Sequence, residues 1–392
     1  MDSMKGCGDN EDSFSKAFDR SLIAKCNRMR SFLERHKNCL EKHIPDLRQF
    51  ASSEGGLVTD EIRAVVWPVL AESLVSDVCC DDDFGSSTSA SDSDFESALS
   101  TLSDEEDDPT TPTADLEDKV PLSKLRNHGD WGQVDLDVHR TLARFPPNIS
   151  DDHRKELQEQ LTPLVVRILW ECPQFHYYQG FHDVCLTLLL VLGPQLAQRV
   201  GCNLAKFGAF REYLSKTLDD TVVKELGLMY IMLWKEDADL EKAMRSVGLG
   251  ALFALSWPLT WFSHALHHYE QVVVCFDLFL AAHPLMPIYL SSAFVLWRGS
   301  SLLTRPQEMP IYHHFLNIMP DEVPIKGLIR DAQALYRMMP PDQLQGPLLD
   351  KYHAFLSLRG ERKPLPKISF TKWVAAGTAT AALYLLSRYW LF

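Results

Sequence analysis

The sequence contains no C-x-x-C pair although it has nine cysteines, and their number is odd. A disulfide framework or a zinc ribbon is therefore not indicated, and a reducing compartment is favoured. The nucleotide-binding patterns G-x-x-x-x-G-K-[ST] and G-x-G-x-x-G are missing, as is the nucleophile pattern G-x-S-x-G. Because these patterns are lacking, we do not expect an enzyme with its own small-molecule substrate.

Lys and Arg are absent from the stretch between Ser76 and Asp118, which carries 15 Asp and Glu. This stretch accounts for the net charge of −14, and the rest of the chain is nearly neutral. No basic platform for nucleic acid is therefore expected. The stretch is also too polar to bury enough apolar surface to offset the entropy cost of ordering. We therefore expect residues 76–118 to form a disordered insertion within a folded domain.

Strand signals are lacking as well, because no alternation of Val, Ile and Thr is bounded by hairpin turns. Apolar residues recur instead at intervals of three and four, the period of helices with one buried face. Pro68 is expected to perturb a short helix that follows Asp60. The patterns predict an all-α fold, with further helices in residues 21–50, 151–171, 184–192, 203–218, 221–236, 238–246, 264–282 and 284–298.

The chain divides into segments of different composition. Residues 1–20 are polar, lack the apolar core of a signal peptide and are expected to be flexible. The helical region covers residues 21–356 and contains the acidic insertion. Residues 357–368 form a basic linker with prolines, and residues 369–392 are mainly apolar.

The apolar C-terminal segment has the features of a membrane anchor. Trp373 to Ser387 is 15 residues long without a charge, and Arg388 can snorkel to the interface beside Tyr389 and Trp390. Counted from Trp373 to Phe392, the run has 20 residues and would form a helix of about 30 Å. The basic residues before it place the bulk of the chain in the cytosol. An amphipathic helix docked on the domain is the alternative, but the segment has no polar face.

A second apolar run, Val247–Phe262, has 16 uncharged residues. It is short for a membrane span and Pro258 interrupts it, so we expect a pair of core helices. Three histidines follow it, with a spacing that could hold a metal ion: His264, His267 and His268. Because only Glu270 lies nearby as a further ligand, we interpret them as a cluster on a helix surface. No metal site is expected.

Two short stretches carry an unusual set of polar residues. The sequence V-D-L-D-V-H-R, from Val134 to Arg140, has the spacing apolar-x-x-Asp-x-x-Arg. The sequence Y-Y-Q-G, from Tyr177 to Gly180, precedes an apolar helix. On residue type alone, Arg140 would be a surface residue paired with an aspartate one helical turn earlier, and the glutamine would be a polar cap.

In this order, the two stretches resemble the motifs I-x-x-D-x-x-R and Y-x-Q-G of the TBC domain, the family of Rab GTPase-activating proteins. The family motif R-x-x-x-W stands upstream, from Arg63 to Trp67, and L-S-W-P-L-T-W-F from Leu255 resembles the family's P-x-x-W-F. The resemblance covers about residues 57–300. The sequence departs from the family's usual residues at three positions, each of which keeps an apolar side chain of similar size: Val134 for Ile, Phe181 for Met and Phe276 for Trp.

The resemblance implies a multi-helical TBC domain that accelerates GTP hydrolysis by a GTP-loaded Rab small GTPase. The chain would then be an enzyme activator without substrate turnover of its own. Arg140 would be the arginine finger and Gln179 the glutamine finger. Asp137 would hold Arg140, while Tyr177 and Gly180 would shape the loop that presents Gln179.

The resemblance also assigns Arg63 and Trp67 to the structure of the domain. No cofactor of its own is expected, because the Rab binds GTP and Mg²⁺. The expected partners are the Rab and a lipid bilayer contacted through residues 369–392. The short span suits the thin endoplasmic-reticulum membrane of about 27 Å, with the Golgi as an alternative, and favours a Rab of early secretory traffic. A non-catalytic Rab-binding scaffold and a tether acting through the acidic insertion remain as alternatives.

Overall fold

The computed structural model describes residues 8–81, 120–143, 146 and 150–358. Every regular element in these ranges is a helix, which confirms the all-α prediction for this part of the chain. Most of the predicted acidic insertion and the whole predicted anchor lie outside the described residues.

The first helices of the chain extend further than expected. α1 begins inside the segment that was expected to be flexible, and α3 continues six residues into the range assigned to the insertion. Helix propagation adds one hydrogen bond per ordered residue, so a helix that is already formed can extend into polar sequence. The elements are α1 (Gly8–His36), η1 (Leu40–His43), α2 (Ile44–Ser52) and α3 (Asp60–Asp81).

Pro68 lies within α3 without ending it, so the expectation of a short helix here is wrong. Proline removes one backbone hydrogen bond from a helix interior. Its neighbours Val66, Trp67 and Leu70 are at most 1% exposed, so α3 is held by packing on the core. Tertiary packing of this kind supplies most of the stability of helices in proteins and here outweighs the lost hydrogen bond.

The middle of the chain carries the two motif stretches. α6 begins where the Ser150 side chain accepts a hydrogen bond from the backbone N–H of His153, and it agrees with the predicted helix 151–171. The predicted helix 203–218 is divided between the end of α7 and the short α8. The elements are α4 (Leu122–Leu125), α5 (Trp131–Leu142), α6 (Asp151–Trp170), α7 (Phe181–Lys206) and α8 (Phe210–Ser215).

The C-terminal half of the described chain is a series of helices joined by short turns. The predicted helices 221–236 and 238–246 agree with the first two, whereas the predicted helix 264–282 begins only at Tyr269. The elements are α9 (Val222–Glu236), α10 (Ala238–Ser246), η3 (Ala251–Ala254), α11 (Ser256–Leu259), α12 (Tyr269–Ala281), α13 (Met286–Leu303), α14 (Met309–Asn317), α15 (Ile325–Met338), α16 (Pro341–Gln345) and α17 (Pro347–Leu358).

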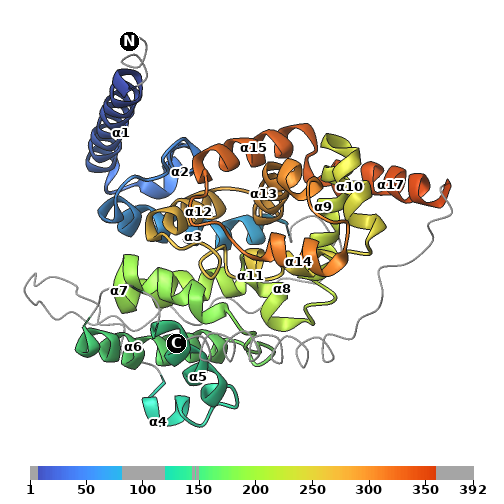
Figure 1. Ribbon diagram of the computed structural model, residues 1–392. Coiled ribbons are helices and arrows are strands. Elements are labelled where there is room, and N and C mark those ends of the chain that lie inside the picture. The colour runs from blue at the N-terminus through green and yellow to red at the C-terminus, as the bar shows by residue number, and fades with distance from the viewer. Residues whose placement is uncertain (1–7, 82–119, 144–145, 147–149, 359–392) are drawn as a thin grey trace, which may run out of the picture.

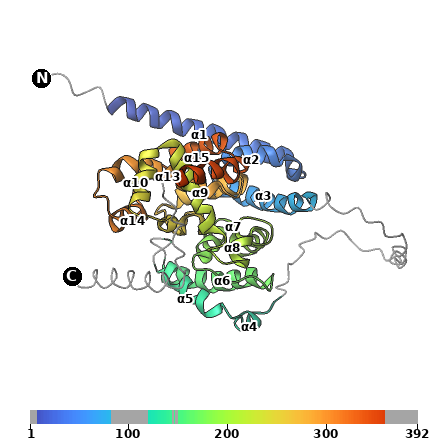
Figure 2. The same cartoon turned by 90° about the vertical axis from the view of Figure 1, so that its right-hand side faces the viewer.

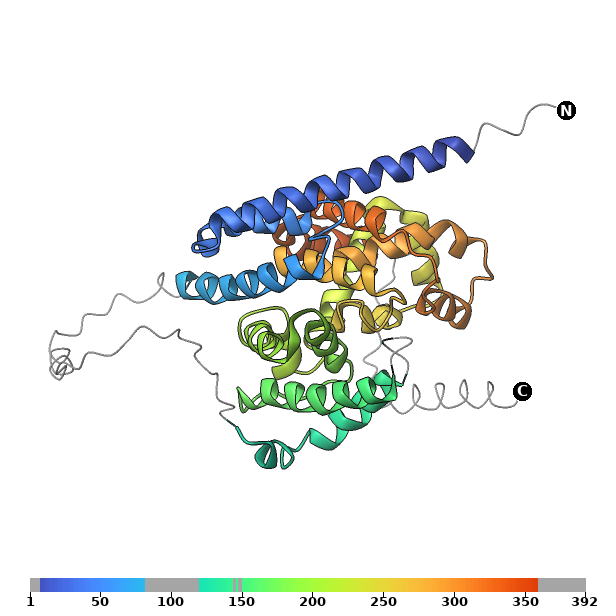
Figure 3. The same cartoon turned by 90° about the vertical axis from the view of Figure 1, so that its left-hand side faces the viewer.

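Figure 1 shows the helices stacked in layers on both sides of α7. α7 packs against α6 on one side and against α3 on the other, and α5 packs on α6. α13 packs on α15 and α9 within the C-terminal half. Figures 2 and 3 show α1 lying across the outside of the body, on the side opposite α4, α5 and α6.

Among the described residues, α7 alone is long and apolar enough to cross a membrane. More than half of its apolar stretch is buried against neighbouring helices of the domain. Gly193 interrupts it with a φ of 72°, at the position where the sequence predicted the end of a core helix. We therefore interpret α7 as a core element.

The apolar run Val247–Phe262 is part of the core, as expected, but it does not form a pair of full helices. It contains only the short elements η3 and α11, followed by turns. Trp257, Trp261 and Phe262 are each 1% exposed. Trp261 and Phe262 adopt positive φ values of 48° and 67°, so the chain turns here and cannot continue a helix.

Candidate functional site

Arg140 lies near the C-terminal end of α5, and its side chain is 64% exposed. Its Nη1 atom donates a hydrogen bond to Oδ1 of Asp137, which is 3.1 Å away and one helical turn earlier. Asp137 is 2% exposed, and its Oδ2 accepts a further hydrogen bond from Gln133 at 3.0 Å. A buried carboxylate thus holds one terminal nitrogen of an exposed guanidinium.

Gln179 lies on the loop between α6 and α7 and is exposed. The next residue, Gly180, caps the start of α7 with a φ of 112°, a conformation that residues with a Cβ rarely adopt. A Cβ at Gly180 would also lie 2.8 Å from the Cγ2 atom of Thr260. Glycine is therefore required for the loop that presents Gln179.

Tyr177 ties this loop to α5. Its hydroxyl donates a hydrogen bond to Oδ2 of Asp137 at 3.1 Å, and its backbone N–H donates to Asp130 at the start of α5 at 3.1 Å. Burial raises the pKa of the Tyr177 phenol, and the charge of Asp137 raises it further, so the hydroxyl stays protonated and remains a donor. One carboxylate therefore contacts both the arginine and the segment that carries the glutamine.

His182 extends the network into the first turn of α7. Its Nδ1 atom lies 2.6 Å from the Tyr177 hydroxyl, and its Nε2 atom lies 2.8 Å from the hydroxyl of Thr141. Thr141 follows Arg140 on α5 and is buried, as is His182. The imidazole therefore bridges the glutamine loop and the end of α5 from inside the domain.

Asp183 links the same network to a third segment. It accepts hydrogen bonds from Thr141 at 3.1 Å and from Nδ1 of His264 at 3.0 Å. Burial would raise the pKa of Asp183, but the His264 hydrogen bond and the two nearby imidazoles lower it. His264 lies in a turn before α12, so the expected cluster of three histidines on one helix is wrong.

The end of α11 and the turn after it support the glutamine loop directly. The Tyr178 hydroxyl donates to the backbone oxygen of Leu259 at 2.8 Å, and Gly180 packs against Thr260. This is the stretch that resembles the family's P-x-x-W-F. Its buried aromatic residues fix the turn on which the loop rests.

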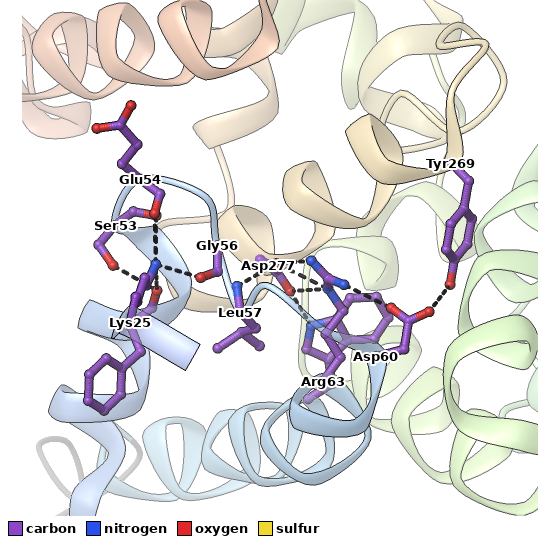
Figure 4. A network of polar contacts seen from close by, with 11 residues as sticks. Lys25, Ser53, Glu54, Gly56, Leu57, Asp60, Arg63, Tyr269 and Asp277 are labelled. Carbon is purple, nitrogen blue, oxygen red and sulfur yellow. Dashed lines mark hydrogen bonds and ion pairs between the residues drawn. The ribbon is translucent and has the colours of Figure 1, made fainter. Parts of the chain in front are cut away.

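Arg63 and Trp67, on α3, lie in the core and do not join Arg140 and Gln179. Both donate hydrogen bonds to Asp277 of α12, which is fully buried (Figure 4). The Arg63 Nη2 atom is 3.0 Å from Oδ2, and the Trp67 Nε1 atom is 2.8 Å from Oδ1. The backbone N–H of Leu57 donates to the same carboxylate at 2.8 Å, and a Cβ at Gly56 would collide with it. These contacts pin α3 and the turn before it to α12.

Lys25 of α1 holds that turn from the other side, as Figure 4 shows. Its ammonium nitrogen lies 2.5–3.3 Å from four backbone oxygens that share its three N–H donors, those of Phe50, Ser53, Glu54 and Gly56. Burial lowers the pKa of Lys25 to about 8, so the side chain is still an ammonium with three donors at pH 7. It thereby anchors α1 to the domain.

The sequence alone assigned no role to Thr141, His182 or Asp183, and it placed His264 on a helix surface rather than in the site. A signal was present for the first three, because Thr141 follows Arg140 and the other two lie two and three residues after the motif Tyr177-x-Gln179-Gly180. No local pattern connects His264 with them, since it lies 81 residues after Asp183.

Residues 60–303 match the Rab-GTPase-TBC domain family. The match covers α3 through α13 and contains every predicted site residue. The chain therefore belongs to the Rab-GTPase-TBC family.

Among known proteins, the chain is similar to human TBC1 domain family member 20, with 37% identity over 303 residues. This alignment covers 77% of the chain and 65% of that relative, so the chain spans just under two thirds of its length. It is 31% identical to the GTPase-activating protein gyp10 of Schizosaccharomyces pombe, over 58% of the chain and 60% of that protein. The crystal structure of the Ypt/Rab-GAP domain of Gyp1p has a similar fold, with a TM-score of 0.54 at 14% identity, covering 81% of this chain and 99% of that one.

Proposed function

We propose that this chain accelerates GTP hydrolysis by a Rab small GTPase, with Arg140 and Gln179 entering the nucleotide site of the partner. The observation that carries the proposal is the exposure of both side chains above one buried network. Asp137 contacts Arg140 directly and contacts the glutamine loop through Tyr177. Family membership and the similarity to the GTPase-activating protein gyp10 support the same function.

The chemistry requires little covalent work from the activator. It must stabilise charge on the transferring phosphoryl group and place the attacking water. An arginine suits the first task, because its planar and permanently charged fork matches phosphate oxygens. A glutamine amide suits the second, because it both donates and accepts hydrogen bonds. GTP and Mg²⁺ would be bound by the Rab, so the activator needs no cofactor.

We further propose that the protein acts on a membrane-bound Rab of early secretory traffic, anchored by residues 369–392 in the endoplasmic-reticulum or Golgi membrane. The support is the uncharged run from Trp373 to Ser387, the basic residues before it and its short length. Anchoring would confine both proteins to one surface and raise their effective concentration.

A panel of GTP-loaded Rabs tests the proposed function. Single-turnover phosphate release is measured with the fragment 1–358, with Gln179→Ala as the impaired reference. A Rab is a substrate if the wild-type fragment accelerates its GTP hydrolysis and the variant does not. Binding to Rabs without acceleration of any of them would favour the non-catalytic scaffold instead.

Tyr177→Phe is expected to reduce the stimulated rate by about 10–150-fold, because a hydrogen bond to a charged group contributes about 1.5–3 kcal/mol. The substitution removes the hydroxyl between Asp137 and His182 but keeps the ring. Rate and Rab affinity are measured separately, and the loss should appear mainly in the rate. Tyr336→Phe on α15 is the matched control. An unchanged rate in Tyr177→Phe would show that the link to Asp137 does not position the glutamine loop.

Removing residues 369–392 is expected to release the protein from membranes while leaving its activity on soluble Rab unchanged. Flotation with liposomes and extraction with carbonate are measured for the full chain and the shortened chain. If the shortened chain still resists carbonate extraction, a different segment inserts into the bilayer and the anchor assignment is wrong.

A further inference from the structure

Three side chains that commonly bind metals meet at the turn between α1 and α2. His36 ends α1, Cys39 precedes η1 and His43 ends η1. Their ligand atoms all lie within 4.8 Å of one another, and the described residues contain no other such group. Figure 3 shows this end of α1 on the side of the domain opposite α5, so the cluster is separate from the site around Arg140.

The backbone explains why the three residues converge. The Cys39 N–H donates to the His36 oxygen at 2.9 Å, and the Lys42 N–H donates to the Cys39 oxygen at 3.1 Å. These bonds close a tight turn that brings the ring centroids of His36 and His43 to 4.0 Å. All three side chains are partly exposed, so an ion can reach them from solvent.

We propose that His36, Cys39 and His43 form a zinc-binding site. Imidazole and thiolate are preferred ligands of Zn²⁺, and a tetrahedral ion with three protein ligands keeps one position for water. Asp46 lies beside the cluster, with Oδ2 3.2 Å from Nδ1 of His43. A carboxylate in this position orients a metal-bound imidazole and leaves its other nitrogen free for the ion.

Bound zinc would link the end of α1 to the start of α2. The competing explanation is aromatic packing alone, because Phe32 lies 4.6 Å from the His36 ring and 5.4 Å from the His43 ring, between centroids. The two explanations differ over Cys39, since stacking needs no thiolate whereas zinc binding does.

The test uses the full chain in detergent, with a non-thiol reductant and with Co²⁺ and Zn²⁺ as probes. Wild type is expected to take up one Co²⁺ more per chain than Cys39→Ser, with a thiolate-to-cobalt absorption band that Zn²⁺ removes. Cys172→Ser, which changes another partly exposed cysteine, is the matched control and should keep the band. Asp46→Asn should weaken Zn²⁺ binding by about 10–100-fold, the usual effect of losing such a partner.

Thermal melting gives a second measurement, because a ligand that binds only the folded state raises the melting temperature. Zn²⁺ should raise it in wild type and in Cys172→Ser, but not in Cys39→Ser. Equal metal uptake by wild type and Cys39→Ser would overturn the proposal. So would a cobalt band that survives His43→Ala, since the cysteine would then bind metal without the histidines.

Discussion

Replacing Arg140 by alanine is expected to lower the stimulated rate of GTP hydrolysis by about 10³–10⁵-fold, the contribution that an arginine finger makes. The substitution removes the guanidinium that the site would bring to the phosphoryl group. Arg140→Lys should be almost as slow, because an ammonium keeps the charge but loses the planar fork. The measurement is single-turnover phosphate release from a GTP-loaded cognate Rab.

The fold should survive this change, because Arg140 is exposed and Asp137 keeps its contacts with Gln133 and Tyr177. Binding to a Rab with a transition-state mimic should weaken more than binding to the GTP state, because the finger acts on developing charge. Arg337→Ala, an exposed position on α15, is the matched control. A rate for Arg140→Ala within about threefold of wild type would be far from the expected loss and would contradict the finger assignment.

Asp277→Ala is expected to reduce the free energy of unfolding by about 3–5 kcal/mol, the usual cost of breaking a buried ion pair. It would leave the Arg63 guanidinium buried and without its main acceptor. The Trp67 indole N–H and the Leu57 backbone N–H would lose theirs as well. Urea unfolding of the fragment 1–358, followed by circular dichroism, measures the effect.

Two variants separate this explanation from a general sensitivity to mutation. Asp277→Asn keeps an acceptor oxygen but not the charge, so it should lower the free energy of unfolding less than Asp277→Ala does. Asp331→Ala removes an exposed carboxylate on α15 and should change the stability by less than about 0.5 kcal/mol. If Asp277→Ala unfolds at the same urea concentration as wild type, the network in Figure 4 does not hold α3 to α12.

Helix positions followed from the sequence where an apolar stripe had clear ends. The predicted helix 151–171 matches α6, because Ser150 caps it and its apolar side chains face the core. The prediction of a short helix at Pro68 was wrong, since α3 continues to Asp81 and its burial outweighs one missing hydrogen bond. The run Val247–Phe262 was assigned to the core correctly, but its turns depend on positive φ values that no apolar pattern indicates.

The contacts of the site also fall into two groups, those that local spacing predicts and those that it does not. The pairing of Arg140 with Asp137 follows from their spacing, because residues three apart lie on one face of a helix. The contact between Tyr177 and Asp137 joins residues 40 positions apart, and the pairing of Arg63 with Asp277 joins residues 214 apart. Helical periodicity carries no information about contacts at such separations.

The sequence by itself determined that this protein is all-α, that its negative charge lies in one segment, and that its motifs are those of a TBC domain. These features are local, since they depend on composition, on periodicity and on residues a few positions apart. Only the tertiary structure decided that Asp137 serves Arg140 and Tyr177 together, and that His182 and Asp183 connect them to His264. It did so because buried polar groups must find hydrogen-bond partners, and the partners available to them are set by which helices the core brings together.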